Sequence, residues 1–134
     1  MPRDKVDVAK RGVDAYNRRD VDGFFAELAT PDFELHAGIA RALGGDVYRG
    51  REGVEQFDRD RGESWEEVQN VAEEFRDLGD SVLVLATIKG RGRASGAPVE
   101  VAFAAILDFR GDRIRRIRAY FDRAEGLRAA GLCK

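Results

Sequence analysis

The chain has 134 residues, of which 43% are hydrophobic and 36% charged, and this composition indicates one globular domain over residues 1–134 rather than a disordered chain. Its 23 basic and 25 acidic residues leave a net charge of −2, which argues against a nucleic-acid partner. Cys133 is the one cysteine, and no apolar run approaches the roughly 20 residues of a membrane span, so we expect a cytoplasmic protein with neither a disulfide nor a membrane segment.

The N-terminal residues predict two helices. The first has an apolar stripe at helical spacing, made of Val6, Ala9, Val13 and Tyr16. Asp20 then favours the start of a second, short helix, because its carboxylate can accept free amide protons of the first turn. The residues that this helix is expected to bury are Phe24, Phe25 and Leu28. We expect Pro31 to end it, since the residue before a proline disfavours helical geometry.

The next segment predicts a strand, a loop and a third helix. Residues 33–36 alternate between apolar and polar and indicate a short strand. A glycine-containing loop runs from there to Arg49, and loops of this length are often functional. A third helix begins at Arg51. The residues expected along one side of it are Val54, Phe57, Arg61 and Trp65.

From Val68 onward the period of the pattern changes from 3.6 to 2, which predicts strands. The expected strands are 68–78, 81–91, 98–109 and 113–122. Their connections are short turns, which force neighbouring strands to run antiparallel. Helices followed by a strand meander indicate an α+β fold, in which the helices pack on one face of a curved sheet.

The last two strands predict the character of each face of the sheet. One face of the strand 98–109 is apolar and carries Val99, Val101, Phe103, Ala105, Leu107 and Phe109. On the strand 113–122 the apolar set Ile117, Ala119 and Phe121 alternates with Arg116, Arg118 and Tyr120. We therefore expect a strongly apolar inner face and an outer face that is mixed and rich in arginine.

Four stretches resemble motifs of the SnoaL-like family, namely 15–22, 31–36, 48–54 and 111–114. They occur in the family's order, and the match extends over nearly the whole chain. The resemblance implies a nuclear transport factor 2-like, cystatin-like fold, in which a cone-shaped, curved antiparallel sheet wraps around N-terminal helices and encloses an apolar pocket. It also implies a homodimer that packs through the outer face of the sheet.

The same resemblance argues against one activity of these relatives. Ketosteroid isomerases and SnoaL cyclases place an acidic residue at the position of Ala105. Isomerases also place their general-base aspartate at the position of Ala37 and a tyrosine at that of Gly12. Because none of these three residues can donate or accept a proton through its side chain, we do not expect a ketosteroid isomerase of the usual type, and a SnoaL-type cyclase is disfavoured.

Two residues are weak candidates for catalysis. His36 is the one histidine and could act as a general base in a pocket, although strand alternation directs it away from any pocket that Ala37 faces. Asp58 lies beside the apolar side of the third helix, where a solvated carboxylate is the alternative. A single histidine without a nearby cysteine predicts no metal site, and we expect no cofactor.

The candidate ligand-binding residues are aromatic or apolar side chains of the expected inner face and loop end, namely Tyr16, Tyr48, Phe57, Trp65, Phe103, Ile117 and Phe121. Each also fits plain core packing or, for Tyr48, a loop anchor. A local basic cluster is formed by Arg110, Arg113, Arg115, Arg116 and Arg118. Their expected role is cross-strand pairing with Glu73, Glu74, Glu100 and Asp108 rather than binding of RNA or phosphate.

Two functions remain open at this point. The first is binding of a small, mostly apolar molecule in the cone pocket without catalysis. The second is a cofactor-independent isomerase, dehydratase, cyclase or hydrolase that works by general acid–base proton transfer, which needs an ionisable group in the pocket. The non-ionisable residues at Ala37 and Ala105 favour the first.

Overall fold

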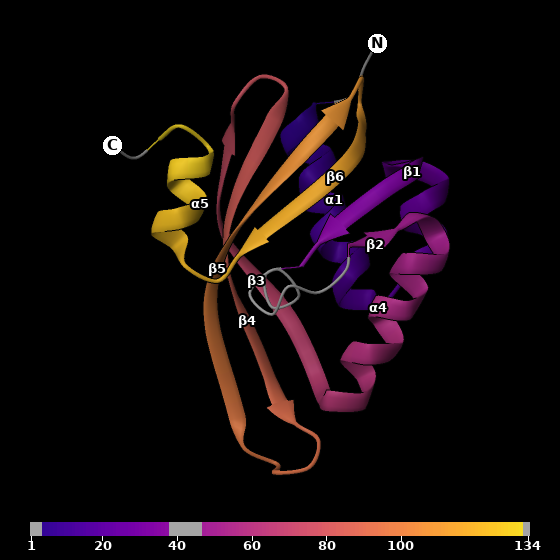
Figure 1. Ribbon diagram of the computed structural model, residues 1–134, viewed down its shortest axis with the longest axis vertical. Coiled ribbons are helices and arrows are strands. Elements are labelled where there is room, and N and C mark those ends of the chain that lie inside the picture. The colour runs from indigo at the N-terminus through magenta and orange to yellow at the C-terminus, as the bar shows by residue number, and fades with distance from the viewer. Residues whose placement is uncertain (1–3, 38–46, 133–134) are drawn as a thin grey trace.

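A computed structural model describes residues 4–37 and 47–132 of the chain (Figure 1). Its elements, in chain order, are α1 (Lys5–Arg18), α2 (Val21–Gly23), the π-helical turn η1 (Phe24–Leu28), β1 (Ala29–His36), β2 (Tyr48–Arg49), α4 (Gly50–Ser64), β3 (Trp65–Asp77), β4 (Ser81–Gly92), β5 (Pro98–Arg110), β6 (Arg113–Tyr120) and α5 (Arg123–Ala129). The expected α+β architecture is confirmed. No helix within the described ranges is long and apolar enough to cross a bilayer.

The strands form one curved, six-stranded sheet in the order β2-β1-β6-β5-β4-β3 (Figure 1). The hairpin-connected pairs β3–β4, β4–β5 and β5–β6 are antiparallel, as the short turns require. β1 and β6 pair in parallel, which the sequence did not predict. No tight turn joins these two strands, so the chain is free to bring them together in either direction.

α1 and α4 lie on the inner face of the sheet, and α5 lies on the outer face. Along β5, Phe103 and Ala105 belong to the core cluster that contains Val8 and Ala9 of α1. The alternate residue Ala104 of β5 belongs to a second cluster, against which Leu127 of α5 packs. The apolar inner face is therefore confirmed, and part of the outer face is also apolar because α5 covers it.

Two expected element boundaries are wrong. The helical segment ends at Leu28 instead of at Pro31, because the backbone is already extended at Ala29. Pro31 lies inside β1. The register between β1 and β6 shifts between Ala29 and Glu34, so Pro31 occupies an irregular part of the strand where a missing amide donor is tolerated. Trp65 begins β3 instead of ending α4, since Gly62 weakens the last helical turn and an aromatic residue favours a strand.

The arginines of this basic cluster are held mainly by carboxylates. Arg116 and Arg118 both bind Asp108, at Nε–Oδ2 distances of 2.8 Å and 3.0 Å. Arg110 and Arg115 bind Asp32 of β1 instead. Of the expected carboxylate partners, Asp108 therefore binds two arginines of the cluster, whereas Glu73, Glu74 and Glu100 pair with Arg123, Arg76 and Lys89.

Candidate functional site

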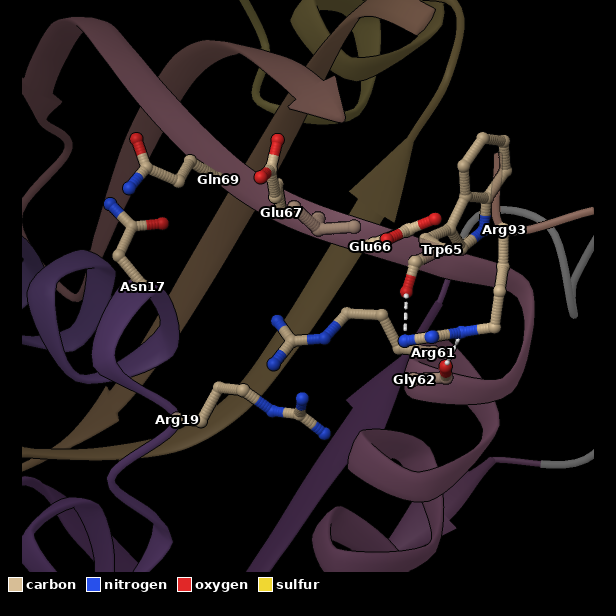
Figure 2. A pocket seen from close by; sticks show the side chains of 10 residues that line it. Asn17, Arg19, Arg61, Gly62, Trp65, Glu66, Glu67, Gln69 and Arg93 are labelled. Atoms are coloured by element: carbon tan, nitrogen blue, oxygen red, sulfur yellow. Dashed lines mark hydrogen bonds between the residues drawn. The ribbon is translucent and has the colours of Figure 1, made fainter. Parts of the chain in front are cut away.

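A cavity of about 580 Å³ opens where the C-terminal ends of α1 and α4 meet the start of β3 (Figure 2). Its volume lies within the range of small-molecule sites. The side chains that give it its chemical character are Asn17, Arg19, Arg61, Trp65, Glu66, Glu67, Gln69 and Arg93. They come from α1, α4, β3 and the turn after β4, so the site exists only in the folded chain.

Two unusual backbone conformations shape this cavity. Arg19, just after α1, has a φ of 57°, and Glu67 in β3 has a φ of 54°. They are the non-glycine residues with positive φ in the described part of the chain, and both line the cavity. Such conformations cost roughly 1–3 kcal/mol each and cluster at functional sites. At Glu67 the strand is irregular, because its register with β4 shifts between Glu66 and Gln69.

Arg61 is largely buried in the cavity wall, with 8% of its side-chain surface exposed. Its Nη2 donates to Oδ1 of Asp58 at 2.7 Å, and its Cζ lies 4.2 Å from the ring centroid of Tyr16. Its Nη1 is buried and has no hydrogen-bond partner among the described residues. A buried donor without a partner is costly, so this atom marks a place where an acceptor would be stabilised.

Asp58 sits between two guanidinium groups. Arg19 donates to it through Nε at 2.9 Å and through Nη2 at 3.0 Å, in addition to the bond from Arg61. Burial alone would raise the pKa of the Asp58 carboxyl, but the hydrogen bond and charge of Arg19, together with Arg61, hold that pKa below its usual value. Asp58 is thus an ionised clamp between α4 and the end of α1, and a weak proton acceptor.

Two further contacts fix the walls of the cavity. The amide group of Asn17 donates to the carbonyl oxygen of Asn70 at 3.0 Å and accepts from its backbone N–H at 2.7 Å, which ties α1 to β3. Arg93 donates through Nε to the carbonyl oxygen of Gly62 at 2.8 Å and through Nη2 to that of Trp65 at 3.4 Å. Arg93, in the turn after β4, therefore fixes the junction between α4 and β3 through these two hydrogen bonds.

Three of the expected ligand-binding residues form an aromatic cluster that does not line the cavity but touches its wall where Tyr16 contacts Arg61. The rings of Tyr16 and Phe57 lie 6.4 Å apart, and those of Phe57 and Tyr48 lie 5.3 Å apart in an edge-on arrangement. The Tyr48 hydroxyl donates to Asp60 at 3.1 Å, and burial raises the pKa of that hydroxyl. Trp65 lies in the cavity wall itself, with 37% of its surface exposed.

The other expected site residues lie elsewhere. Phe103 is buried in the main core and Ile117 packs against it, whereas Phe121 follows β6 and is 43% exposed. His36 lies beside Glu34, with Nε2 3.0 Å from Oε1, and neither residue lines the cavity. The hydrogen bond with His36 lowers the pKa of Glu34. Across residues 4–37 and 47–132, no group of three or more His, Cys, Asp or Glu side chains is arranged to hold a metal ion.

Sequence reasoning missed the polar residues that line the cavity, Asn17, Arg19 and Arg93 among them. It placed Arg61 on the apolar side of the third helix without assigning it to a site. That position was itself a signal, because a charged residue on an apolar stripe must be buried with partners or face a cavity. The positive φ of Arg19 and Glu67 has no signal in the sequence, since neither residue is a glycine.

Comparison with known proteins gives a family and a set of structural neighbours. A family described as "SnoaL-like domain" matches residues 9–117. A protein of unknown function from Burkholderia pseudomallei, described as NTF2-like, is 25% identical with a TM-score of 0.76, over 92% of this chain and 95% of its own. A putative SnoaL-like polyketide cyclase from Jannaschia sp. CCS1 is 21% identical with a TM-score of 0.73, over 87% of this chain and 83% of its own.

An uncharacterized cystatin-fold protein from Novosphingobium aromaticivorans is 22% identical with a TM-score of 0.71, over 87% of this chain and 97% of its own. No curated protein sequence matches the chain. Together with the curved sheet around α1 and α4, these similarities establish the α+β cone fold that the sequence predicted.

Proposed function

The chain belongs to the SnoaL-like domain family, and we propose that it binds a small molecule in the cavity between α1, α4 and β3. The observation that carries the proposal is that both non-glycine residues with positive φ in the described chain, Arg19 and Glu67, line this one cavity of about 580 Å³. Strain retained at a concave surface is typical of a binding site.

The cavity changes what kind of ligand we expect. The sequence suggested a mostly apolar molecule, but the wall combines the indole of Trp65 with several charged and amide side chains. A ligand with a flat apolar part and at least one polar group fits this surface better. Apolar contact would supply area, and the polar groups would fix orientation.

Binding without catalysis is the version of this proposal that the geometry favours. His36 is paired with Glu34 and does not line the cavity. Asp58 is ionised and held by two arginines, so it has little tendency to accept a proton. Neither catalytic candidate from the sequence is thus placed to move a proton to or from a ligand in this cavity.

A ligand-induced rise in melting temperature tests the proposal, because a molecule that binds only the folded state stabilises it by mass action. We would screen neutral, anionic and cationic flat aromatic compounds against the wild type, Trp65→Ala and Phe121→Ala. Trp65 and Phe121 are similarly exposed, but only Trp65 lines the cavity. A shift lost in Trp65→Ala and kept in Phe121→Ala supports the proposal; the reverse pattern, or no shift with any compound, contradicts it.

Proton-transfer catalysis is a second candidate, because the cavity wall holds two carboxylates, Glu66 and Glu67, together with the buried cation Arg61. A carboxylate base and a cation that stabilises the developing enolate are the elements of proton abstraction next to a carbonyl group. Deuterium exchange at the α-carbon of ketone ligands, followed by NMR, tests this candidate. If the wild type catalyses this exchange and Glu67→Gln or Glu66→Gln abolishes it, proton-transfer catalysis replaces binding without catalysis as the proposed function.

The expected homodimer through the sheet remains part of the proposal in a narrower form. α5 packs over Ala104 and Ile106 of β5, so it covers one region of the outer face. A second copy would have to use the remaining outer surface, where Val71 of β3 is 40% exposed. Light scattering after size-exclusion chromatography, on the wild type and on Val71→Arg, tests this arrangement: a dimer that Val71→Arg dissociates supports it, and a monomeric wild type contradicts it.

A further inference from the structure

We propose that the ligand of this cavity is an aromatic carboxylate, or an oxyanion of the same planar geometry, and that Arg61 is the residue that recognises its charge. This inference rests on the proposed binding function and names the chemical class of the ligand. It is carried by the unpaired donor on Arg61, by the balance of charge around it and by the exposed indole of Trp65.

Arg61 combines deep burial with an unused hydrogen-bonding group. Its side chain is 8% exposed, and one of its two terminal nitrogens, Nη2, is bound to Asp58 at 2.7 Å. The other, Nη1, is buried without a partner among the described residues. Figure 2 shows the side chain reaching from the end of α4 towards α1, with its guanidinium between Arg19 and β3. A guanidinium in this state is suited to a planar oxyanion acceptor.

The charges around Arg61 leave this side of the cavity positive. A single carboxylate, Asp58, serves both Arg19 and Arg61, and one negative charge cannot neutralise two cations. Arg93 adds a third cation, whose bonds go to the neutral carbonyl oxygens of Gly62 and Trp65. An anionic group on the ligand would complete the charge balance that Asp58 begins.

Two acidic residues also line the cavity and bear on this balance. Glu66 and Glu67 lie on the β3 side, and Figure 2 shows their carboxylates turned away from the guanidinium groups of Arg19 and Arg61. Glu67 is exposed to solvent and Glu66 is half-buried, so water screens the charge of Glu67 more fully than that of Glu66. The cavity is thus divided into an arginine side, which would receive the anion, and an acidic side, which disfavours an anion at the opposite end of the ligand.

The remaining part of the ligand is inferred from Trp65. Trp65 lines the cavity and 37% of the residue's surface is exposed, and an aromatic ring of a ligand can stack on an indole. Val68 adds an aliphatic contact on the same strand. A molecule with an aromatic body and a carboxylate uses both the indole and the guanidinium, whereas an aliphatic acid or a neutral aromatic compound uses only one of them.

The test compares 2-naphthoate with 2-naphthamide, which share the aromatic body and differ in charge. Isothermal titration calorimetry would measure both on the wild type, Arg61→Met, Arg61→Lys and the control Arg59→Met. Arg59 lies on the same helix and bonds to Gln56, and it does not line this cavity. We expect the wild type to bind 2-naphthoate at least about tenfold more tightly than 2-naphthamide, and Arg61→Met to abolish that preference while Arg59→Met keeps it.

The outcomes separate this inference from the proposed function. If both compounds bind equally and Trp65→Ala weakens both, the cavity is a binding site but the assignment of an anion to Arg61 is wrong. If neither compound binds to the wild type at millimolar concentration, the aromatic-carboxylate assignment fails, and the wider screen decides on the proposed function. Circular dichroism establishes that each variant folds. If Arg61→Met does not fold, Arg61→Lys provides the test, because lysine keeps the charge but lacks the planar fork of the guanidinium. A preference of Arg61→Lys for 2-naphthoate over 2-naphthamide as strong as that of the wild type would overturn the role of the guanidinium.

Discussion

Arg61 lies over the ring of Tyr16, with its Cζ 4.2 Å from the centroid of the phenol ring. The contact joins α4 to α1 directly beside the cavity. Because Arg61 is only 8% exposed, the interaction is largely desolvated, and cation–π contacts are strongest under that condition. The arginine that we assign to ligand recognition is therefore held by an aromatic ring on one side and a carboxylate on another.

This contact predicts a measurable coupling between the two residues. Replacement of Tyr16 by Leu removes the ring, and a double-mutant cycle with Arg61→Met should give a coupling free energy of about 1–2 kcal/mol. Urea unfolding of the four proteins measures it. Tyr16→Phe serves as the control, since it keeps the ring and should retain most of the coupling. Equal losses for Tyr16→Phe and Tyr16→Leu would show that the hydroxyl, and not the ring, makes the interaction.

Much of the fold follows from the sequence because its signals are local. The change of period after Val68 and the turn residues predict the antiparallel strands that the structure contains. The two errors, at Pro31 and Trp65, lie at element boundaries, where short-range propensity competes with sheet pairing. The parallel pairing of β1 and β6 depends on contacts distant in the chain, so no local pattern could have revealed it.

The site was harder to predict because it is assembled from distant segments. Arg19, Arg61 and Arg93 come from three different parts of the chain and meet only through tertiary packing. The aromatic candidates Tyr16 and Trp65 stand out in the sequence by residue type alone. A surface arginine and a cavity arginine look alike in sequence, and only the apolar stripe around Arg61 distinguishes it.

Two helical glycines should respond to alanine with opposite signs. A Cβ at Gly12 in α1 would lie 3.4 Å from the flexible end of Ile114, which is ordinary contact. Gly12→Ala should therefore stabilise the protein by about 0.5–1 kcal/mol, since alanine loses less backbone entropy in a helix. A Cβ at Gly126 in α5 would lie 2.6 Å from Cβ of Ala104, and this overlap should cost about 1–3 kcal/mol.

Denaturant unfolding of both variants measures these changes. The comparison is internally controlled, because the substitution is the same and both sites are helical. A stabilised Gly126→Ala protein would mean that α5 does not pack closely on β5. It would also contradict the packing of Leu127 against the apolar cluster that contains Ala104.

Asp108 should make the stability depend on pH in the acidic range. Its carboxylate accepts hydrogen bonds from Ser81, Arg116 and Arg118. Burial alone would raise the pKa of Asp108, but these bonds together lower it below its usual value. A carboxyl whose pKa is lower in the folded state stabilises the protein above its unfolded pKa of about 4, and that contribution is lost as the pH falls through the folded pKa.

The measurement is the difference in unfolding free energy between the wild type and Asp108→Asn from pH 7 to pH 2. We expect a difference of about 2 kcal/mol that stays constant down to about pH 5 and then shrinks with further acidification. Ser81→Ala is the control, because it removes one neutral donor and leaves both arginines in place. A difference that grows as the pH falls would have the wrong sign and would show that Asp108 is not ionised in the folded protein.

Trp65 should contribute little to stability and much to binding. A fully buried tryptophan costs roughly 3–5 kcal/mol when it is replaced by alanine. Trp65 is 37% exposed and lines the cavity, so Trp65→Ala should cost only about 1–2 kcal/mol in urea unfolding.

Trp65 is also the single tryptophan of the chain, so intrinsic fluorescence reports on this position alone. Acrylamide should quench the wild-type emission efficiently, and 2-naphthoate bound in the cavity should protect the indole from that quenching. Emission that acrylamide cannot reach, together with a large loss of stability in Trp65→Ala, would instead place the indole in the core and remove the aromatic wall on which the ligand assignment depends.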